Sequence, residues 1–247
     1  MIGTPPGTNA VGQGNKTKRT ILEFNSNLGV KMFWKIALLI WMSVVIVAIF
    51  LLPPPQPQLG EVSRIFFFHV PMAWVAVLVF LLSFIYSILY LRKRDLTYDK
   101  RANIASRLGL LFTILATISG SIFAKASWGS FWNWDPRETS IFILLLIYGA
   151  YFALRSAVEG EERKATLSGV YAILAFLTVP FLVFVIPRVY QSLHPNDSVI
   201  NSKLRFQMSP AILITFLASM FGFTGLFVWI FKLETRINRL MDETEEG

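Results

Sequence analysis

The sequence predicts an all-α, polytopic membrane protein: a bundle of six transmembrane helices with both termini in the cytoplasm. Of the 247 residues, 54% are apolar and only 15% are charged, whereas a soluble globular chain carries about a quarter charged residues. Long stretches without charge recur along the chain. The basic residues gather on alternate connecting segments, as they do in chains that cross a membrane repeatedly.

The chain begins with a polar segment, residues 1–27, that is rich in Gly, Pro, Thr and Asn. Three basic side chains in this segment, Lys16, Lys18 and Arg19, and the lack of apolar periodicity predict a mobile basic tail. A secretory signal is not expected, because the apolar stretch that follows is too long and no small-residue cleavage site ends it.

Six stretches without charge follow this tail, and each predicts one transmembrane helix. A helix rises about 1.5 Å per residue, so a hydrocarbon layer of ~30 Å takes roughly 20 residues to cross. The fourth stretch is short, and we expect Arg155 to extend it by snorkelling. The membrane domain then covers residues 28–235, and residues 236–247 form a cytoplasmic tail. The six stretches are 36–52, 65–91, 108–124, 139–154, 166–187 and 207–231.

The distribution of Lys and Arg predicts the orientation. With the N-terminus inside, 17 of the 23 basic side chains fall on cytoplasmic segments and 6 on outer segments. This asymmetry follows the positive-inside rule and places both termini in the cytoplasm. The same rule accounts for the net charge of +8 without nucleic acid as a partner.

The sequence contains no cysteine and two histidines, His69 and His194. The lack of cysteine excludes disulfides, thiolate catalysis, Cys-ligated metals and covalent attachment of a c-type haem. Both histidines are predicted on the outer side, His69 one turn into the second helix and His194 in the last outer loop. Two facing imidazoles can ligate a six-coordinate haem iron, although a single histidine near a helix end is more often a structural residue.

The outer loop at residues 126–138 contains three tryptophans within seven residues, with Gly129 allowing a flat ligand to approach closely. If this segment is helical, one face carries an aromatic shelf that ends in an acid. The alternative is an ordinary interfacial aromatic belt. The residues that would share the face are Trp128, Phe131, Trp132 and Asp135, with Trp134 beside them.

Two arginines flank these features. Arg64 precedes His69 by five residues, and Arg137 follows the aromatic loop. A guanidinium suits bidentate pairing with a carboxylate such as a haem propionate. The alternative is plain surface charge, since exposed ion pairs are common and weak.

At these residues the chain resembles a known family. The pattern from Trp128-Gly129 to Trp134-Asp135 resembles the tryptophan-rich WWD signature of the haem-handling proteins of cytochrome c maturation. His-Val-Pro at 69–71 and Thr-Val-Pro at 178–180 resemble the CcmC branch, and the likeness covers roughly residues 63–194. The CcmF and CcsA relatives share the signature but are longer, so the length and the six helices favour the CcmC family.

The resemblance implies a haem delivery protein, not an enzyme, of the bacterial cytoplasmic (inner) membrane. It implies haem b at the outer, periplasmic face, with His69 and His194 as axial ligands. The loop residues Trp128, Gly129, Trp132, Trp134 and Asp135 would lie against the porphyrin, and Arg64 and Arg137 fall on basic positions of the family pattern.

The implied partners are haem, the haem chaperone CcmE, a small membrane subunit, an ATP-binding cassette complex and membrane lipid. Two other functions use the same residues: a bis-His membrane cytochrome that passes electrons, and a small-molecule transporter with an aromatic belt. An enzyme has little support from the residues, because no pair of nucleophile and base is apparent and Asp135 has no candidate partner.

Overall fold

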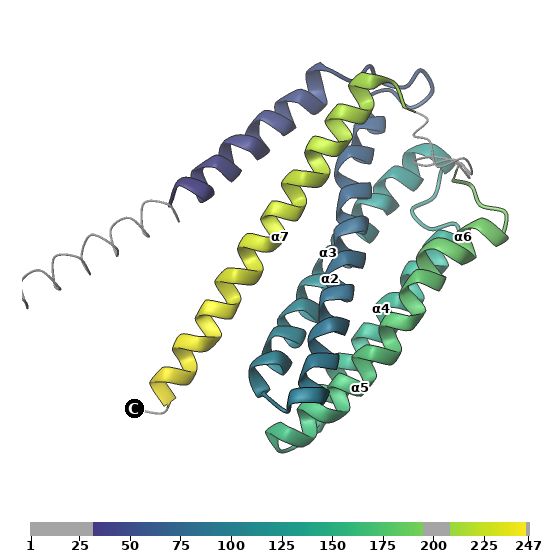
Figure 1. Ribbon diagram of the computed structural model, residues 1–247. Helices are drawn as coiled ribbons and strands as arrows, with labels where there is room; N and C mark the ends of the chain where they lie inside the picture. The colour runs from purple at the N-terminus through teal and green to yellow at the C-terminus, as the bar shows by residue number, and fades with distance from the viewer. Residues whose placement is uncertain (1–31, 195–207, 246–247) are drawn as a thin grey trace, which may run out of the picture. The chain divides into compact units, whose positions relative to one another are not determined.

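The computed structural model describes residues 32–194 and 208–245, and helices account for all the regular structure in these two ranges (Figure 1). Within these ranges, six helical spans are long and apolar enough to cross a membrane, which confirms the predicted all-α, polytopic fold. The basic tail at residues 1–27 lies outside the described residues, as does the segment 195–207 that follows His194. The orientation of the termini stays a prediction.

The chain divides into two compact units after Ser43, a position within the first helix, Met32–Leu51. The remaining helices belong to the second unit, Val44–Gly247. The further elements are η1 (Glu61–Ile65), α2 (Phe66–Lys93), α3 (Leu96–Trp128), α4 (Pro136–Ala157), α5 (Glu161–Pro180), the π-helix η2 (Phe181–Val185), α6 (Ile186–Val189) and α7 (Pro210–Glu245). Short connections join α2 to α3, α3 to α4, and α4 to α5. The last helix, α7, continues through residues 236–245, which were predicted to belong to a C-terminal tail.

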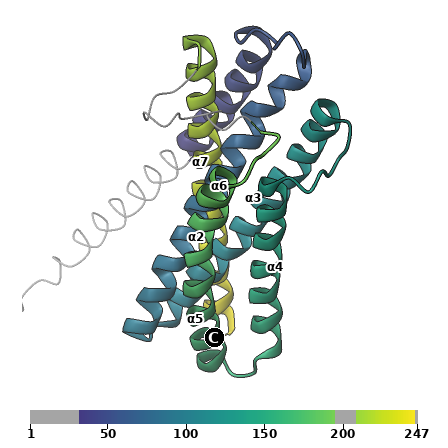
Figure 2. The same cartoon turned by 90° about the vertical axis from the view of Figure 1, so that its right-hand side faces the viewer.

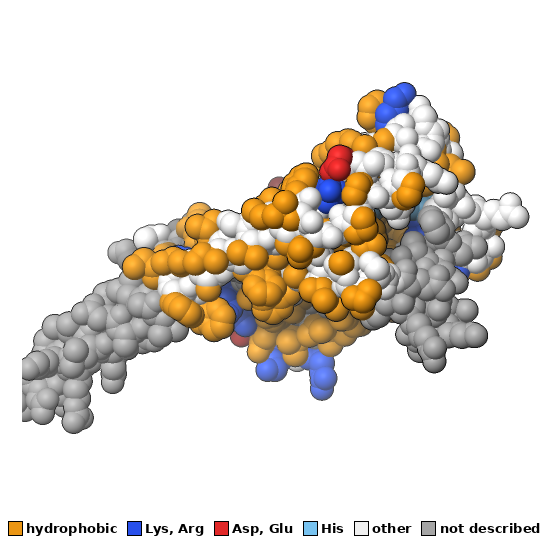
Figure 3. All heavy atoms as spheres, turned by 90° about the horizontal axis from the view of Figure 1, so that it is seen from above, with side chains coloured by type: hydrophobic (Ala, Val, Ile, Leu, Met, Phe, Trp, Pro, Cys, Tyr) orange, Lys and Arg blue, Asp and Glu red, His pale blue; other side chains and the backbone are white. Residues whose placement is uncertain are grey.

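The helix α2 occupies the centre of the bundle and packs against α3, α5 and α7 (Figures 1 and 2). Its buried face includes Val75, Val79 and Phe80, and the Phe80 ring stacks on Tyr148 of α4 with the centroids 3.6 Å apart. Gly109 of α3 lets this ring approach, because a Cβ there would lie 2.5 Å from Phe80. Apolar side chains also cover much of the described surface (Figure 3), as expected for helices that face lipid.

The loops that follow alternate helices gather at one end of the bundle. The connections at 52–60 and 129–135 and the segment 190–194 lie at this end, which we call the site end (Figures 1 and 2). The opposite end carries the connections from α2 to α3 and from α4 to α5. The same grouping of loops is predicted from the sequence, because consecutive spanning helices must run in opposite directions.

The fourth span departs from its prediction. The helix α4 has 22 residues, so it needs no extension by snorkelling. The guanidinium of Arg155 instead forms a buried ion pair with Asp99 of α3, with Nη1 2.8 Å from Oδ1. The snorkelling prediction is therefore wrong, because an acid 56 residues earlier in the sequence gives Arg155 a partner inside the bundle.

The fifth membrane span, Glu161–Val189, is interrupted by the π-helix η2. Pro180 ends α5 and supplies no amide hydrogen, and the amide of Ile186 then bonds to the carbonyl of Phe181, five residues back. The four-residue helix α6 follows and ends before Tyr190. This region carries the chain to the site end, where His194 lies.

Candidate functional site

His69 lies in the first turn of α2, as the sequence predicted, and α3 fixes its ring. Its Nδ1 is 2.9 Å from the carbonyl oxygen of Ala116. A carbonyl can only accept, so Nδ1 carries the hydrogen and Nε2 keeps its lone pair. No hydrogen bond within the described part of the chain engages Nε2.

Gly120 makes room for this ring. A Cβ added at Gly120 would lie 2.7 Å from Cε1 of His69, closer than real Cβ contacts come. The absence of a side chain on this turn of α3 therefore allows the backbone of α3 to press against the imidazole and hold it.

His194 follows the end of α6, and its ring is also held through a hydrogen bond from Nδ1, here to a carboxylate. Its Nδ1 lies 3.2 Å from Oδ1 of Asp135, which as a carboxylate only accepts, so Nε2 again keeps its lone pair. The edge of the ring meets Trp128 with the centroids 4.6 Å apart. Burial and the nearby Arg137 outweigh Asp135 and lower the pKa of His194 to about 4, so the ring is neutral at neutral pH.

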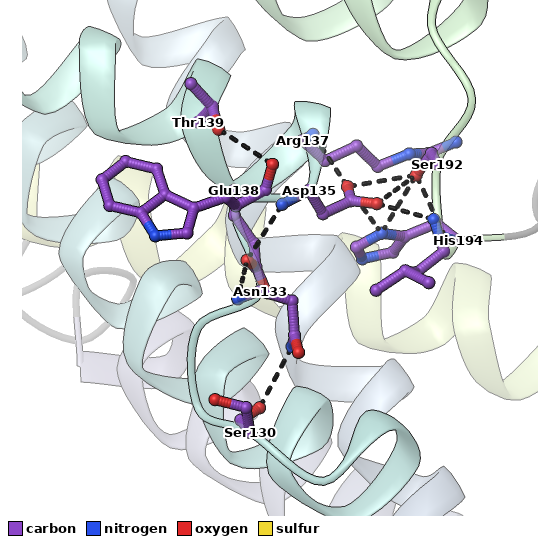
Figure 4. A network of polar contacts seen from close by, with 10 residues as sticks. Ser130, Asn133, Asp135, Arg137, Glu138, Thr139, Ser192 and His194 are labelled. Carbon is purple, nitrogen blue, oxygen red and sulfur yellow. Dashed lines mark hydrogen bonds and ion pairs between the residues drawn. The ribbon is translucent and has the colours of Figure 1, made fainter.

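Asp135 joins the start of α4 to the segment that carries His194 (Figure 4). Its carboxylate accepts hydrogen bonds from the amide of Arg137 at 2.9 Å, the hydroxyl of Ser192 at 2.9 Å and the amide of Leu193 at 2.6 Å. Burial alone would raise the pKa of Asp135, but these donors outweigh it and hold that pKa below its usual value.

These contacts correct two expectations about Asp135. The sequence offered no candidate partner for Asp135, yet its side chain, which is 1% exposed, accepts hydrogen bonds from several donors. It was also expected at the end of an aromatic shelf, whereas it contacts the Nδ1 side of the His194 ring. Three of its partners come from 57 to 59 residues further along the chain, a separation that no local pattern reveals.

The aromatic loop is not helical, so the predicted shared face is wrong. The helix α3 ends at Trp128, because Gly129 takes a left-handed conformation with φ 82°. The capping box of Asp135 and Glu138, with Pro136 in the first turn, starts a new helix. The residues between Gly129 and Asp135 form an irregular connection, in which side chains do not recur at helical spacing.

The three tryptophans therefore separate into two groups. Trp128 contacts His194, whereas Trp132 packs edge to face against Trp134 and Phe142, at centroid distances of 5.9 and 6.1 Å. Trp134 is exposed and has a positive φ of 56°, an uncommon conformation for a large side chain.

Two further residues organise the site and were not foreseen. The carboxylate of Glu138 accepts hydrogen bonds from the amides of Asn133, at 2.6 Å, and Asp135, which shapes the loop (Figure 4). The spacing Asp-x-x-Glu was the signal that could have found it. Ser192 bonds to Asp135 and gave no signal in the sequence.

The two arginines of the sequence analysis have different surroundings. The side chain of Arg137 extends toward Ser192 and His194 (Figure 4), and its charge acts on both His69 and His194. His69 in turn contributes to the lowered pKa of His194, so these three side chains share one region of the site end.

Arg64 is buried and already has acceptors. It forms an ion pair with Glu61 and donates to the carbonyl oxygens of Ile49 and of Pro53, the latter at 3.2 Å. Arg64 thus ties the end of the first helix to η1. Its pairing with a propionate stays a prediction, and it would require these contacts to be exchanged.

The fold and the site define a multi-pass membrane protein that presents two imidazole Nε2 atoms at one end of a helical bundle. The chain belongs to the CcmC family: the family model described as "Heme exporter protein C" matches residues 16–246. This confirms the resemblance found in the sequence.

Named relatives support the same membership. The chain is 31% identical over 185 residues to heme exporter protein C of Paracoccus denitrificans, covering 75% of this chain and 76% of the relative. It is 31% identical over 185 residues to a putative cytochrome c biosynthesis ccmC-like mitochondrial protein of Marchantia polymorpha, covering 74% and 76%. Identity to heme exporter protein C of Escherichia coli K12 is 26% over 174 residues, covering 69% and 67%.

Proposed function

We propose that this protein binds haem b at the outer face of the membrane and delivers it to the haem chaperone CcmE during cytochrome c maturation. Membership of a family whose model is described as heme exporter protein C supports haem as the cargo. The names of the relatives point to transport or delivery instead of catalysis. A small membrane subunit and an ATP-binding cassette complex are the further partners proposed from the family resemblance.

One observation carries the proposal: in both histidines Nδ1 donates a hydrogen bond, and the lone pair on Nε2 is left to bind a metal. A histidine that ligates a metal usually has its other ring nitrogen bonded to a carboxylate or a carbonyl, which fixes the tautomer. Here the acceptors are Asp135 for His194 and the carbonyl of Ala116 for His69. Haem iron in a porphyrin takes two such axial ligands.

The surroundings of the histidines also suit haem. Trp128 offers an aromatic surface beside His194, and Arg137 supplies positive charge for a propionate carboxylate. Both rings are partly exposed at the site end. A ligand held there can be reached by a partner protein, as delivery requires.

The experiment that tests the proposal uses the full chain purified in detergent from haem-replete cells. Oxidised and reduced absorption spectra are expected to show low-spin, six-coordinate haem, and incubation with haem-free CcmE is expected to move the haem to the chaperone. Haem that binds but does not transfer would favour a bis-His cytochrome. Failure to take up added haem would contradict the proposal and favour a small-molecule transporter.

We expect Gly120→Ala to weaken haem binding roughly tenfold, because the new Cβ displaces the ring of His69 and an overpacked site loses about 1–3 kcal/mol. Titration of the purified protein with haemin measures the change. Gly149→Ala is the matched control, since it also lies within a helix but a Cβ there meets nothing within 4 Å. Equal haem affinity in the two variants would contradict the expected role of Gly120.

A further inference from the structure

The segment from Tyr190 to His194 is attached to the bundle mainly through polar contacts. It is not helical, and the side chains of Tyr190 and Leu193 are exposed. The ring contact between Trp128 and His194 is the aromatic attachment. Little apolar packing therefore holds His194 in position, although the proposed function requires a well-placed ring.

The carboxylate of Asp135 provides most of the contacts that attach this segment to the bundle. Asp135 accepts hydrogen bonds from three consecutive residues: the hydroxyl of Ser192, the amide of Leu193 and Nδ1 of His194. The amide of His194 also donates to the hydroxyl of Ser192, at 3.1 Å. Figure 4 shows these side chains converging on the start of α4. Hydrogen bonds to an ionised acceptor are about twice as strong as neutral ones.

We propose that Asp135 is a positioning residue that acts on haem only through His194. Its carboxylate holds the segment of Ser192 to His194 against the start of α4, and so presents Nε2 to the iron. Because the side chain of Asp135 is 1% exposed, it offers almost no surface that a porphyrin could contact. This inference rests on the proposed function, because haem is the ligand.

The carboxylate also changes the ligand strength of His194. A hydrogen bond from Nδ1 to a carboxylate makes an imidazole more basic and a stronger donor to the metal. A stronger donor favours the oxidised iron, so Asp135 lowers the reduction potential of the haem. An ordinary helix cap has no such effect, and the potential therefore separates positioning from mere stabilisation.

The substitution Asp135→Asn tests the inference, because asparagine is as good a helix cap as aspartate. Its amide oxygen can still accept from the amide of Arg137, while the charge that bonds to Leu193 and His194 is lost. Asp95→Asn is the matched control. Asp95 caps α3 by accepting from the amide of Thr97 at 2.8 Å, and it lies at the opposite end of the bundle.

Three measurements on the full chain in detergent decide the matter. In haem-free Asp135→Asn, we expect the Leu193 amide to exchange hydrogen faster while the helices keep their protection. Haemin titration is expected to show affinity lowered about 10- to 100-fold, the usual effect of removing an outer partner of a metal-ligating histidine. Redox titration is expected to show an upward shift of the midpoint potential. Asp95→Asn is expected to match the wild type in all three.

Other results would overturn the inference. An Asp135→Asn variant with the wild-type potential and wild-type exchange at Leu193 would mean that Asp135 does not act through His194. Loss of protection along the whole of α4 would make it a structural cap. A wild-type protein that binds no haem would overturn the proposed function instead, and the exchange measurement on haem-free protein would still decide whether Asp135 holds this segment.

Discussion

Replacing His69 or His194, the proposed axial ligands, with alanine is expected to lower haem affinity by more than about 100-fold, since loss of an outer partner of a metal-ligating histidine alone costs about 10- to 100-fold. The two variants are expected to differ. His69 is held within a long helix by α3, whereas His194 lies on a segment attached by Asp135. His194→Ala should therefore keep more five-coordinate haem, bound through His69, than His69→Ala keeps through His194.

Absorption and electron paramagnetic resonance spectra of the two purified variants measure this effect. Residual haem is expected to change from low spin to high spin, and added imidazole is expected to restore the low-spin spectrum by entering the vacated position. A fold defect would not respond to imidazole. If both variants retained full haem with an unchanged spectrum, ligation would have to be assigned to other residues.

Asp99→Ala is expected to lower the free energy of unfolding by about 3–5 kcal/mol, the usual cost of removing one partner of a buried ion pair. The side chains of Asp99 and Arg155 are 8% and 15% exposed, so the remaining guanidinium would be left with little water to solvate it. Thermal unfolding in detergent measures the loss. The haem spectrum should not change, because the pair lies at the end of the bundle opposite the site.

The control for this prediction is an exposed ion pair. Arg239 and Glu243 of α7 are 2.9 Å apart and one turn apart on an exposed face, and Glu243→Ala is expected to cost less than about 0.5 kcal/mol. Replacing Asp99 and Arg155 together with apolar residues of similar volume should recover most of the loss. Equal stability of Asp99→Ala and Glu243→Ala would mean that the buried pair contributes nothing.

The features that the sequence predicted are those that the bilayer imposes on any chain crossing it. Backbone groups in lipid must bond within the segment, so apolar stretches of sufficient length become helices, and their number follows from the pattern. Because consecutive spans run in opposite directions, His69, Trp128 and His194 lie at the same end of the bundle. These steps need no knowledge of which helix packs against which.

The features that the sequence did not predict depend on partners far along the chain. The pairing of Arg155 with Asp99 joins residues 56 apart, and the contact of Asp135 with His194 joins residues 59 apart. Helix packing decides both. The prediction for the aromatic loop was wrong for a local reason. It assumed helical spacing through Gly129, but this residue takes a left-handed conformation that ends the helix.

The π-helix between Pro180 and Ile186 sets the direction in which the following chain leaves the bundle. A helical turn closed by a bond from the fifth residue contains one residue more than an α-turn. Each residue of an α-helix advances the chain by about 100° around its axis, so this extra residue is equivalent to a rotation of that size. His194 thus owes its angular position partly to a count of residues well before it. A single inserted residue in a helix can therefore change the direction of the side chains that follow it, without any substitution of those side chains.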